Sequence, residues 1–390
     1  MATLASAGLL PGQPLEESSL VPMDEYARTR SALEQYRALA AEDDEAMLPE
    51  TGKAVQPGDH YDGVPRLIRL LTRVGDLSAG AVSGDEERYD GDLVTAVQRF
   101  QSRHGLEPDG RIDKMTLAQL NTPLAFRVHQ LELALERWRQ SPYDHSRPAI
   151  VLNLPEFRLR AFRANHQDLE MKIVVGQAPE HKTPLLSSEL ESVIFRPYWN
   201  VPLSIQRAEL VPQILKNPSF VSANRFQMVT GEGDVVEAAL SDDILSRLRS
   251  GSLRLRQRPG PANTLGLAKF VFPNDYQVYM HATSTPGLFA LARRDLSHGC
   301  IRIEKAADLA EWALRDEPGW QRDHIIQAMH GSQSVEVKLT EPIQVVTMYV
   351  TAVALDNGEV HFFDDIYGED EALEQRLAGS PGREANESLR

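Results

Sequence analysis

The chain has 390 residues, with 41 Lys or Arg and 56 Asp or Glu, so its formal net charge is −15 at pH 7. Such an acidic balance excludes the broad basic surface with which proteins bind nucleic acid. Since 42% of the residues are hydrophobic, a chain of this length can bury the cores of about two or three domains.

Residues 1–60 are predicted to form a helical scaffold. The side chains of Tyr26, Leu33 and Tyr36 recur on one approximate face of a helix. Residues 123–147 are predicted to form a linking helix further along the chain. Pro123 favours a helix start, and an apolar stripe follows it at alternating steps of four and three residues.

Residues 61–122, between these two helices, are predicted to form a small helical domain. One of its helices has apolar residues at the helical repeat, namely Leu93, Ala96, Val97 and Phe100. Turn residues at 105–110 then precede a short helix that ends near Leu120. The segments at 96–101, 104–106 and 109–110 resemble the three-helix peptidoglycan-binding domain. The resemblance implies glycan binding, while a purely bracing role stays open. His104 is expected at the surface or as a helix cap.

Residues 148–332 are predicted to form a mostly β domain, because short apolar runs separated by turn residues replace the helical spacing. Residues 203–256 interrupt these runs with two helical stretches. They are predicted to be an inserted capping subdomain over a substrate cleft, with a passive insertion as the alternative. Residues 333–367 contain further strands that pack with the scaffold or with the β domain. Residues 368–390 are expected to be a flexible tail. The predicted fold class is therefore α+β, with an all-α N-terminal part.

The most distinctive stretch is Ser-His-Gly-Cys-Ile-Arg at residues 297–302, since Cys300 is the only cysteine of the chain. A thiol that has no intramolecular disulfide partner and lies next to Gly299 and near His298 favours a nucleophile. Gly299 permits a turn that presents the sulfur to a cleft. Two alternatives stay open. One is an inert buried thiol, and the other is a zinc site formed by Cys300, His298 and His281, although the usual zinc spacings are missing.

His281 is the candidate base for this thiol, because it directly follows the strand-like run at residues 276–280. An imidazole can take the proton of a neighbouring thiol or hold it as a thiolate–imidazolium pair. The backbone amides of Gly299 and Cys300 are candidates for stabilising a developing oxyanion. A thiol beside a base therefore predicts acyl transfer in two steps.

Two segments, Met-His-Ala-Thr at residues 280–283 and the stretch at 297–302, resemble the paired signature of the L,D-transpeptidase catalytic domain. Further segments that precede this site also resemble the family and occur in the same order as in the family. They are residues 151–159, 174–176, 182–184, 198–202, 258–261, 265–266 and 272–273. The layout is most similar to the large periplasmic L,D-transpeptidases of Gram-negative bacteria. The resemblance implies a catalytic domain at about residues 148–332.

The resemblance also implies the activity. Such enzymes form 3→3 cross-links in peptidoglycan through a cysteine acyl-enzyme, and they release D-Ala from a tetrapeptide donor stem. They need no cofactor and no metal. The implied partners are peptidoglycan stem peptides and glycan, carbapenem-type β-lactams as covalent inhibitors, and proteins of cell-wall synthesis. The implied location is the periplasm, although residues 1–10 lack the basic start of an export signal.

In family terms, Cys300 is the nucleophile, His281 the base, and the main-chain carbonyl of Ala282 orients that imidazole. His298 polarises the site or binds the acyl donor. Arg302 pairs with a stem carboxylate or forms a structural salt bridge.

Three more residues complete the set of candidates. Ser297 is expected to position the turn by hydrogen bonding. Tyr279 and Trp199 either line the cleft or, as aromatic residues at strand positions, belong to the core. Two other functions use the same sequence features. The first is an L,D-carboxypeptidase, or an amidase that releases a wall protein, with water as the acceptor. The second is a non-catalytic peptidoglycan-binding protein.

Overall fold

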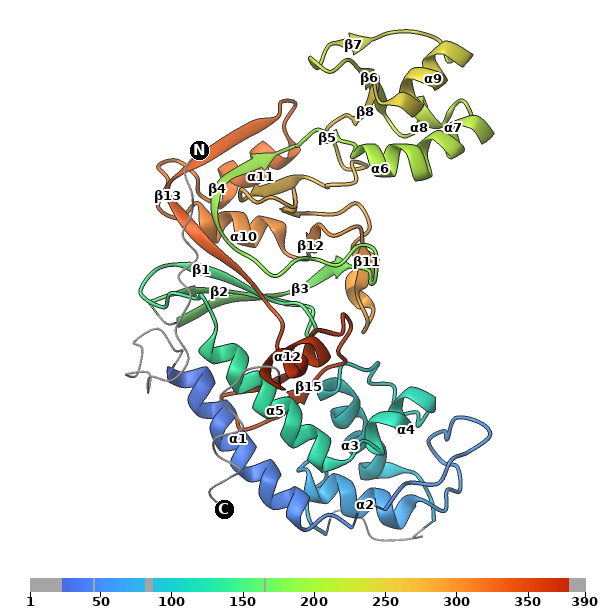
Figure 1. Cartoon of the computed structure of the whole chain (residues 1–390), viewed down its shortest axis with the longest axis vertical. Helices are drawn as coiled ribbons and strands as arrows, with labels where there is room; N and C mark the ends of the chain where they lie inside the picture. Colours follow the sequence, from blue (N-terminus) through green and yellow to red (C-terminus); the bar gives the residue numbers. More distant parts are fainter. Residues whose placement is uncertain (1–22, 45, 81–86, 165, 379–390) are drawn as a thin grey trace. The chain divides into compact units, whose positions relative to one another are not determined.

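The computed structural model describes residues 23–44, 46–80, 87–164 and 166–378 (Figure 1). The chain divides into two compact units, the first made of residues 1–143 with 349–390 and the second of residues 144–348. Helices dominate the first unit and strands the second, so the predicted α+β class is confirmed. The expectations for residues 1–22 and 379–390 lie outside the described residues.

The first unit combines two long helices with a small domain of shorter ones. Its elements are α1 (Met23–Ala41), α2 (Val64–Arg73), α3 (Gly91–Arg103), α4 (Lys114–Leu120), α5 (Leu124–Arg139), β14 (Ala352–Ala354), β15 (Val360–Phe362) and α12 (Glu369–Ala378). Helices α1 and α5 pack along one another. Helices α2 to α4 share one core, in which Leu67, Leu71 and Val97 are fully buried. The predicted apolar face of α3 is thus the face that this domain buries.

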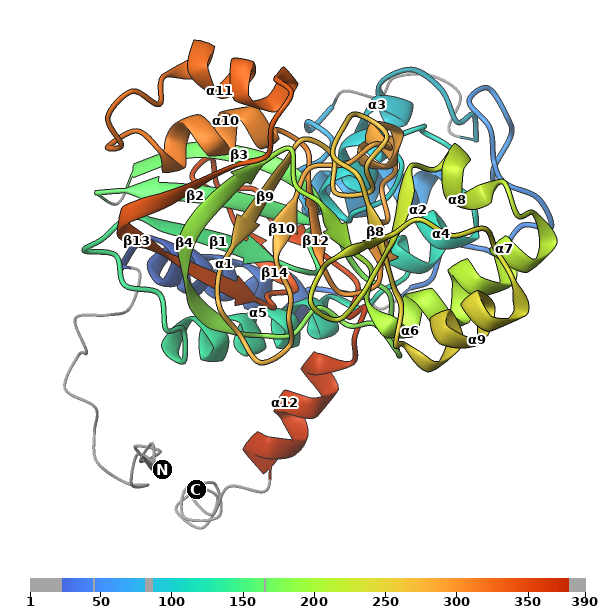
Figure 2. The same cartoon turned by 90° about the horizontal axis from the view of Figure 1, so that it is seen from above.

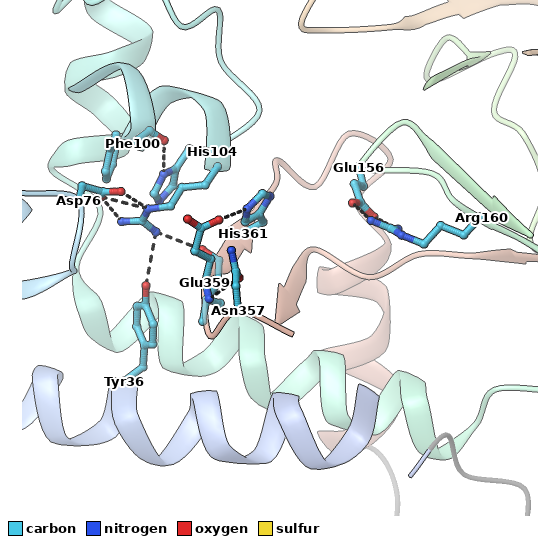
Figure 3. Close-up of polar contacts among 11 residues, drawn as sticks. Tyr36, Asp76, Phe100, His104, Glu156, Arg160, Asn357, Glu359 and His361 are labelled. Atoms are coloured by element: carbon cyan, nitrogen blue, oxygen red, sulfur yellow. Dashed lines mark hydrogen bonds and ion pairs between the residues drawn. The ribbon is translucent and has the colours of Figure 1, made fainter. Parts of the chain in front are cut away.

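A buried ion pair links α3 to other parts of the first unit (Figure 3). Arg103 donates to the two carboxylate oxygens of Asp76 at 2.8 and 3.0 Å. It also donates to the carbonyl of Val360 in β15 at 3.2 Å. His104 caps the helix, since its Nδ1 lies 2.7 Å from the carbonyl oxygen of Phe100. The expected capping role is therefore confirmed, whereas a surface position is wrong, because the ring is buried and stacks on Phe100.

The chain returns to the first unit after residue 348. Strands β14 and β15 pair as an antiparallel hairpin, and α12 follows them. The expectation of a flexible tail is wrong for residues 369–378. Asp370 of α12 accepts a hydrogen bond from Thr351 at 2.6 Å and pairs with Arg137 at 2.6 Å. Leu373 is buried one turn later. A mostly polar helix is therefore held by one short internal face.

The second unit is a closed barrel. Its nine-stranded sheet has the order β11-β3-β12-β10-β9-β4-β13-β1-β2, and β2 also pairs with β3, so the sheet closes on itself (Figure 2). The strands are β1 (Ala149–Asn153), β2 (Arg158–Arg163), β3 (His166–Gly176), β4 (Ser187–Phe195), β9 (Ala268–Val271), β10 (Met280–His281), β11 (Asp295–Ser297), β12 (Ile301–Ile303) and β13 (Val335–Met348). The mostly β architecture that the sequence predicts for this part of the chain is confirmed.

Three short helical segments complete the barrel domain. They are η2 (Pro286–Ala290), α10 (Ala306–Ala313) and α11 (Arg322–His330). Helices α10 and α11 pack together, and α11 also contacts β4. The strands expected in residues 333–367 are shared between the units. Strand β13 joins the barrel between β4 and β1, whereas the β14–β15 hairpin belongs to the first unit.

The segment predicted as an insertion, residues 203–256, has a sheet and a core of its own, and these also include β5 and the last residue of β8. The elements are β5 (Trp199–Asn200), α6 (Leu203–Ile205), η1 (Gln206–Leu210), α7 (Val211–Lys216), α8 (Phe220–Ala223), β6 (Phe226–Val229), β7 (Val235–Val236), α9 (Asp242–Ser250) and β8 (Arg254–Gln257). Its four strands pair in the order β5-β8-β6-β7. Figure 1 shows these elements grouped together at one end of the second unit. The core centres on Trp199, Ile214 and Leu255.

No helix of the described residues is both long enough and apolar enough to cross a membrane.

Candidate active site

The parallel pairing of β10 with β12 brings the two sequence signatures together. His281 lies opposite Arg302, and the amide of Ile301 donates to the carbonyl of Tyr279 at 3.0 Å. Side chains alternate across a strand, so Tyr279 and His281 lie on the same face as Cys300 and Arg302. Ile301 lies on the other face and is fully buried. Residues distant in sequence therefore converge around the thiol.

The turn before Cys300 is held by hydrogen bonds of its own. The amide of Gly299 donates to the hydroxyl of Ser297 at 3.1 Å, and that hydroxyl donates to the carbonyl of Cys300 at 2.6 Å. Thr183 donates to the carbonyl of Gly299 at 2.8 Å. Gly299 has φ +106°, a conformation that other residues rarely adopt. Ser297 thus lies where the sequence predicts a turn-positioning residue.

This hydrogen bonding differs from the expectation for the oxyanion hole. The Gly299 amide, which the sequence suggests as an oxyanion donor, instead donates to the hydroxyl of Ser297 within the turn. The Cys300 amide makes no hydrogen bond with the described residues. Of these two amides, the Cys300 amide is therefore the one that is available to a substrate.

The end of β3 closely approaches this turn. A Cβ atom at Gly176 would lie 1.7 Å from the carbonyl oxygen of His181 and 2.9 Å from the Cα of Gly299. The hydroxyl of Thr183 also accepts from the Gly176 amide at 2.9 Å. Only glycine fits at position 176, so the backbone at the end of β3 packs directly against the turn.

His281 is buried and neutral. Its Nδ1 lies 2.5 Å from the carbonyl oxygen of Ala282, which is the contact that the family resemblance implies. A carbonyl can only accept, so Nδ1 carries the hydrogen and Nε2 keeps its lone pair. Burial lowers the pKa of His281 to about 3, while the carbonyls of Ala282 and Leu265 act in the opposite direction. The ring is therefore available as a base.

The thiol of Cys300 is also neutral at rest. Burial raises its pKa above the ordinary value. The nearby backbone amide and hydroxyl of Tyr279 and the charges of Lys269 and Arg302 lower this pKa and favour the thiolate, but these effects are smaller. The resting site therefore contains a neutral thiol and a neutral imidazole. Among the described residues, the two side chains make no direct hydrogen bond to each other, although Tyr279 contacts both.

Two cations, Lys269 and Arg302, lie beside the thiol. The Nζ of Lys269 lies 3.9 Å from the centre of the Tyr279 ring, and Lys269 pairs with His281 in the sheet. The Nε of Arg302 is buried without a hydrogen-bond partner. Within the described part of the chain, neither side chain forms an ion pair within 4.0 Å, although the charge of Glu336 acts on Lys269. The salt bridge considered for Arg302 is thus not formed.

Lys269 is the residue that sequence reasoning missed. It is a lysine in an otherwise apolar four-residue strand, β9, and one pairing step away from the strand of His281. A charged residue in a short, otherwise apolar strand is a usable signal. Finding it required knowing that β9 and β10 are neighbours.

The two remaining candidates connect the site to the insertion. The side chain of Trp199, in β5, belongs to the core of the insertion, and Tyr279 packs against this core. The Nε2 of His298 lies 2.7 Å from Oε1 of Glu209, in η1. The His298 ring also lies 4.7 Å from the ring of His181, centre to centre. His298 thus faces the insertion.

The zinc alternative has no support in this geometry. In residues 23–378, apart from the segments without a description, no group of three or more His, Cys, Asp or Glu side chains is placed to hold a metal ion.

Family models match two parts of the chain. The L,D-transpeptidase catalytic domain matches residues 147–337, and the "Putative peptidoglycan binding domain" matches residues 61–120. A curated Haemophilus influenzae protein with the name "Putative L,D-transpeptidase" is 32% identical over 248 residues. That alignment covers 63% of this chain and 49% of the relative, so the chain spans about half the length of the relative.

Solved structures are more distantly similar. An L,D-transpeptidase from Xylanimonas cellulosilytica is 14% identical, with a TM-score of 0.23, over 77% of this chain and 99% of that one. L,D-transpeptidase 3 from Mycobacterium tuberculosis, solved with a faropenem-derived adduct, is 13% identical with a TM-score of 0.24. That match covers 52% of this chain and 60% of the other.

Proposed function

We propose that this chain forms 3→3 cross-links in peptidoglycan through an acyl-enzyme on Cys300, because residues 147–337 match the L,D-transpeptidase catalytic domain. One observation carries this proposal. A buried, neutral His281, with Nδ1 held by the Ala282 carbonyl, lies on the same face of adjacent strands as the thiol. Such a pair supplies a nucleophile and its base.

The first half-reaction acylates the enzyme. The thiol proton passes to Nε2 of His281 as the sulfur attacks the carbonyl carbon of the third residue of a tetrapeptide stem. The Cys300 amide donates to the oxyanion that forms. The peptide bond to D-Ala then breaks, and the imidazolium returns its proton to the departing amine. A thioester on Cys300 and free D-Ala remain.

The second half-reaction forms the cross-link. The side-chain amine of a diaminopimelate residue on another stem attacks the thioester carbon, and the C–S bond breaks. His281 passes a proton from the attacking amine to the leaving thiolate. The site thereby returns to its neutral starting state. If water attacks instead, the product is a tripeptide, which is the hydrolytic alternative.

The electrostatics of the site suit an anionic donor. Lys269 and Arg302 form no ion pair within 4.0 Å in the described structure, although the charge of Glu336 acts on Lys269. Both cations favour the thiolate form of Cys300. We propose that they bind the carboxylate of the donor stem, because a partly buried cation is stabilised by a fixed anion. Tyr279 and Trp199 extend this surface towards the insertion, which we propose caps the cleft.

The small helical domain supports a location at the cell wall. Residues 61–120 match a peptidoglycan-binding model, and we propose that they hold the enzyme on glycan in the periplasm. The family resemblance implies that carbapenem-type β-lactams are inhibitors. These compounds present a strained carbonyl to the same sulfur. They are therefore expected to acylate Cys300.

The testing experiment is incubation with a disaccharide-tetrapeptide, followed by mass analysis of the products. The expected result is a cross-linked dimer with release of D-Ala. Tripeptide without dimer would identify a hydrolase. Unchanged substrate, with the Cys300→Ala variant as the reference, would leave only wall binding.

A further inference from the structure

The chemistry of the second half-reaction leaves one proton to be placed, if the proposed function holds. The acceptor is an aliphatic amine with a pKa of about 10.4, so it arrives as an ammonium ion. Forming the amide removes two protons from its nitrogen. One of them restores the thiol, and the other must leave the site. The balance is ammonium plus thioester giving amide, thiol and one free proton.

His281 is poorly suited to release this extra proton. Its ring is buried, and Nδ1 is held by the Ala282 carbonyl. Its single lone pair already carries the proton that cycles between sulfur and amine. A second group is needed, one that attracts an ammonium ion and is open to solvent.

Glu209 and His298 have these properties. Oε1 of Glu209 lies 2.7 Å from Nε2 of His298, and the two side chains are 41% and 40% exposed. His298 precedes Cys300 by only two residues, while Glu209 comes from η1 of the insertion. The pair is therefore close along the backbone to the thioester and open to water.

Side chains of both charge signs lie near the thiol and the turn before it. Lys269 and Arg302, on β9 and β12, are positive and suit the donor carboxylate. Glu209 is a carboxylate held by the residue next to Gly299. An anionic donor and a cationic acceptor would thus each meet the opposite charge.

We propose that Glu209 and His298 form the acceptor site of the transfer reaction. The Glu209 carboxylate binds the acceptor ammonium, and the Glu209–His298 pair takes one of its protons and releases it to solvent. The resulting amine lone pair attacks the thioester carbon, the C–S bond breaks, and the second proton reaches the thiolate through His281. The insertion then selects an amine over water as the acceptor.

The competing explanation is a structural one, in which this ion pair only ties the insertion to the catalytic turn. The two explanations differ in which step they affect. If the ion pair is only structural, its loss would change the rates of acylation and of transfer together, and for every nucleophile alike. An ammonium site affects only transfer, and only to acceptors that arrive protonated.

The test uses the full chain with disaccharide-tetrapeptide as donor and as acceptor, and it measures the ratio of dimer to tripeptide. Glu209→Gln is expected to lower this ratio at least about tenfold, since a general base typically contributes 10²-fold or more. Acyl-enzyme formation is followed by mass spectrometry as the internal reference. Glu237→Gln, an exposed residue of the same insertion, is the matched control with an unchanged ratio.

Hydroxylamine is the second acceptor, because it is largely uncharged at neutral pH and needs no deprotonation before attack. Its transfer product is expected to form equally well in Glu209→Gln and in the parent chain. An equal loss with both acceptors, or an unchanged dimer ratio, would overturn the acceptor site and leave the proposed function standing. A parent chain that forms no acyl-enzyme would overturn both.

Discussion

Alkylation of Cys300 by iodoacetamide should accelerate steadily with pH, because the thiol of the resting site is neutral. Burial raises its pKa above the ordinary value of 9.0, and only the thiolate reacts. At a pKa of 9.0 or more, thiolate makes up at most about 1% of the thiol at pH 7 and about 9% at pH 8. The rate should therefore rise close to tenfold per pH unit between about pH 6 and 8.

Two substitutions extend this test to the neighbouring cations. Lys269→Met and Arg302→Met each remove a positive charge that favours the thiolate. Each should move the alkylation profile to higher pH by about one unit, which slows the reaction roughly tenfold at pH 8. Lys338→Met, an exposed residue of β13, is the matched control and should leave the profile in place.

The assay is intact-protein mass spectrometry. Since the chain has one cysteine, a single mass increment reports Cys300 alone. A rate that is already level between about pH 5 and 7 would reveal a preformed thiolate–imidazolium pair. That result would contradict the neutral resting site. Profiles that do not move in either cation variant would contradict the electrostatic role of Lys269 and Arg302.

Three further results are expected. Cys300→Ala should abolish cross-linking and the carbapenem adduct while the melting temperature stays within a few degrees of the parent, and residual adduct would refute the nucleophile. His281→Gln should lower kcat/KM by about 10²–10⁴-fold, and near-normal turnover would move the base role to His298. The third concerns His104. Burial holds the pKa of this imidazole well below its ordinary 6.5. As the pH falls, the imidazole is protonated in the unfolded chain before it is protonated in the folded one. The first unit should therefore lose stability below about pH 6.5, by about 1.4 kcal/mol per pH unit. Hydrogen exchange of α3 should show this acid loss in the parent and less of it in His104→Gln, and equal losses would refute the assignment.

The centre of the site could be predicted because its chemistry is local in sequence. Cys300 and its glycine turn are adjacent, and the Ala282 carbonyl follows His281 directly. The apolar repeat of α3 likewise marks its buried face in the sequence itself. Such features depend on spacing along one segment, so no knowledge of the fold is needed to recognise them.

The partners from other segments could not be predicted. Lys269 reaches the site through the pairing of β9 with β10, and Glu209 reaches His298 from the insertion. The Gly299 amide is occupied only because the Ser297 hydroxyl turns towards it, which the sequence does not encode. Helix α12 was missed because a single buried face, around Asp370 and Leu373, holds a segment of polar composition. Each of these depends on tertiary contacts that propensity and spacing do not encode.

The most direct test is to trap the covalent intermediate. The full chain is mixed with disaccharide-tetrapeptide, quenched in acid within seconds, digested and mapped by mass spectrometry. The expected result is a disaccharide-tripeptide joined as a thioester to Cys300, which hydroxylamine removes. A donor that is consumed while this peptide stays unmodified, or an adduct on any other residue, would contradict catalysis by the thiol.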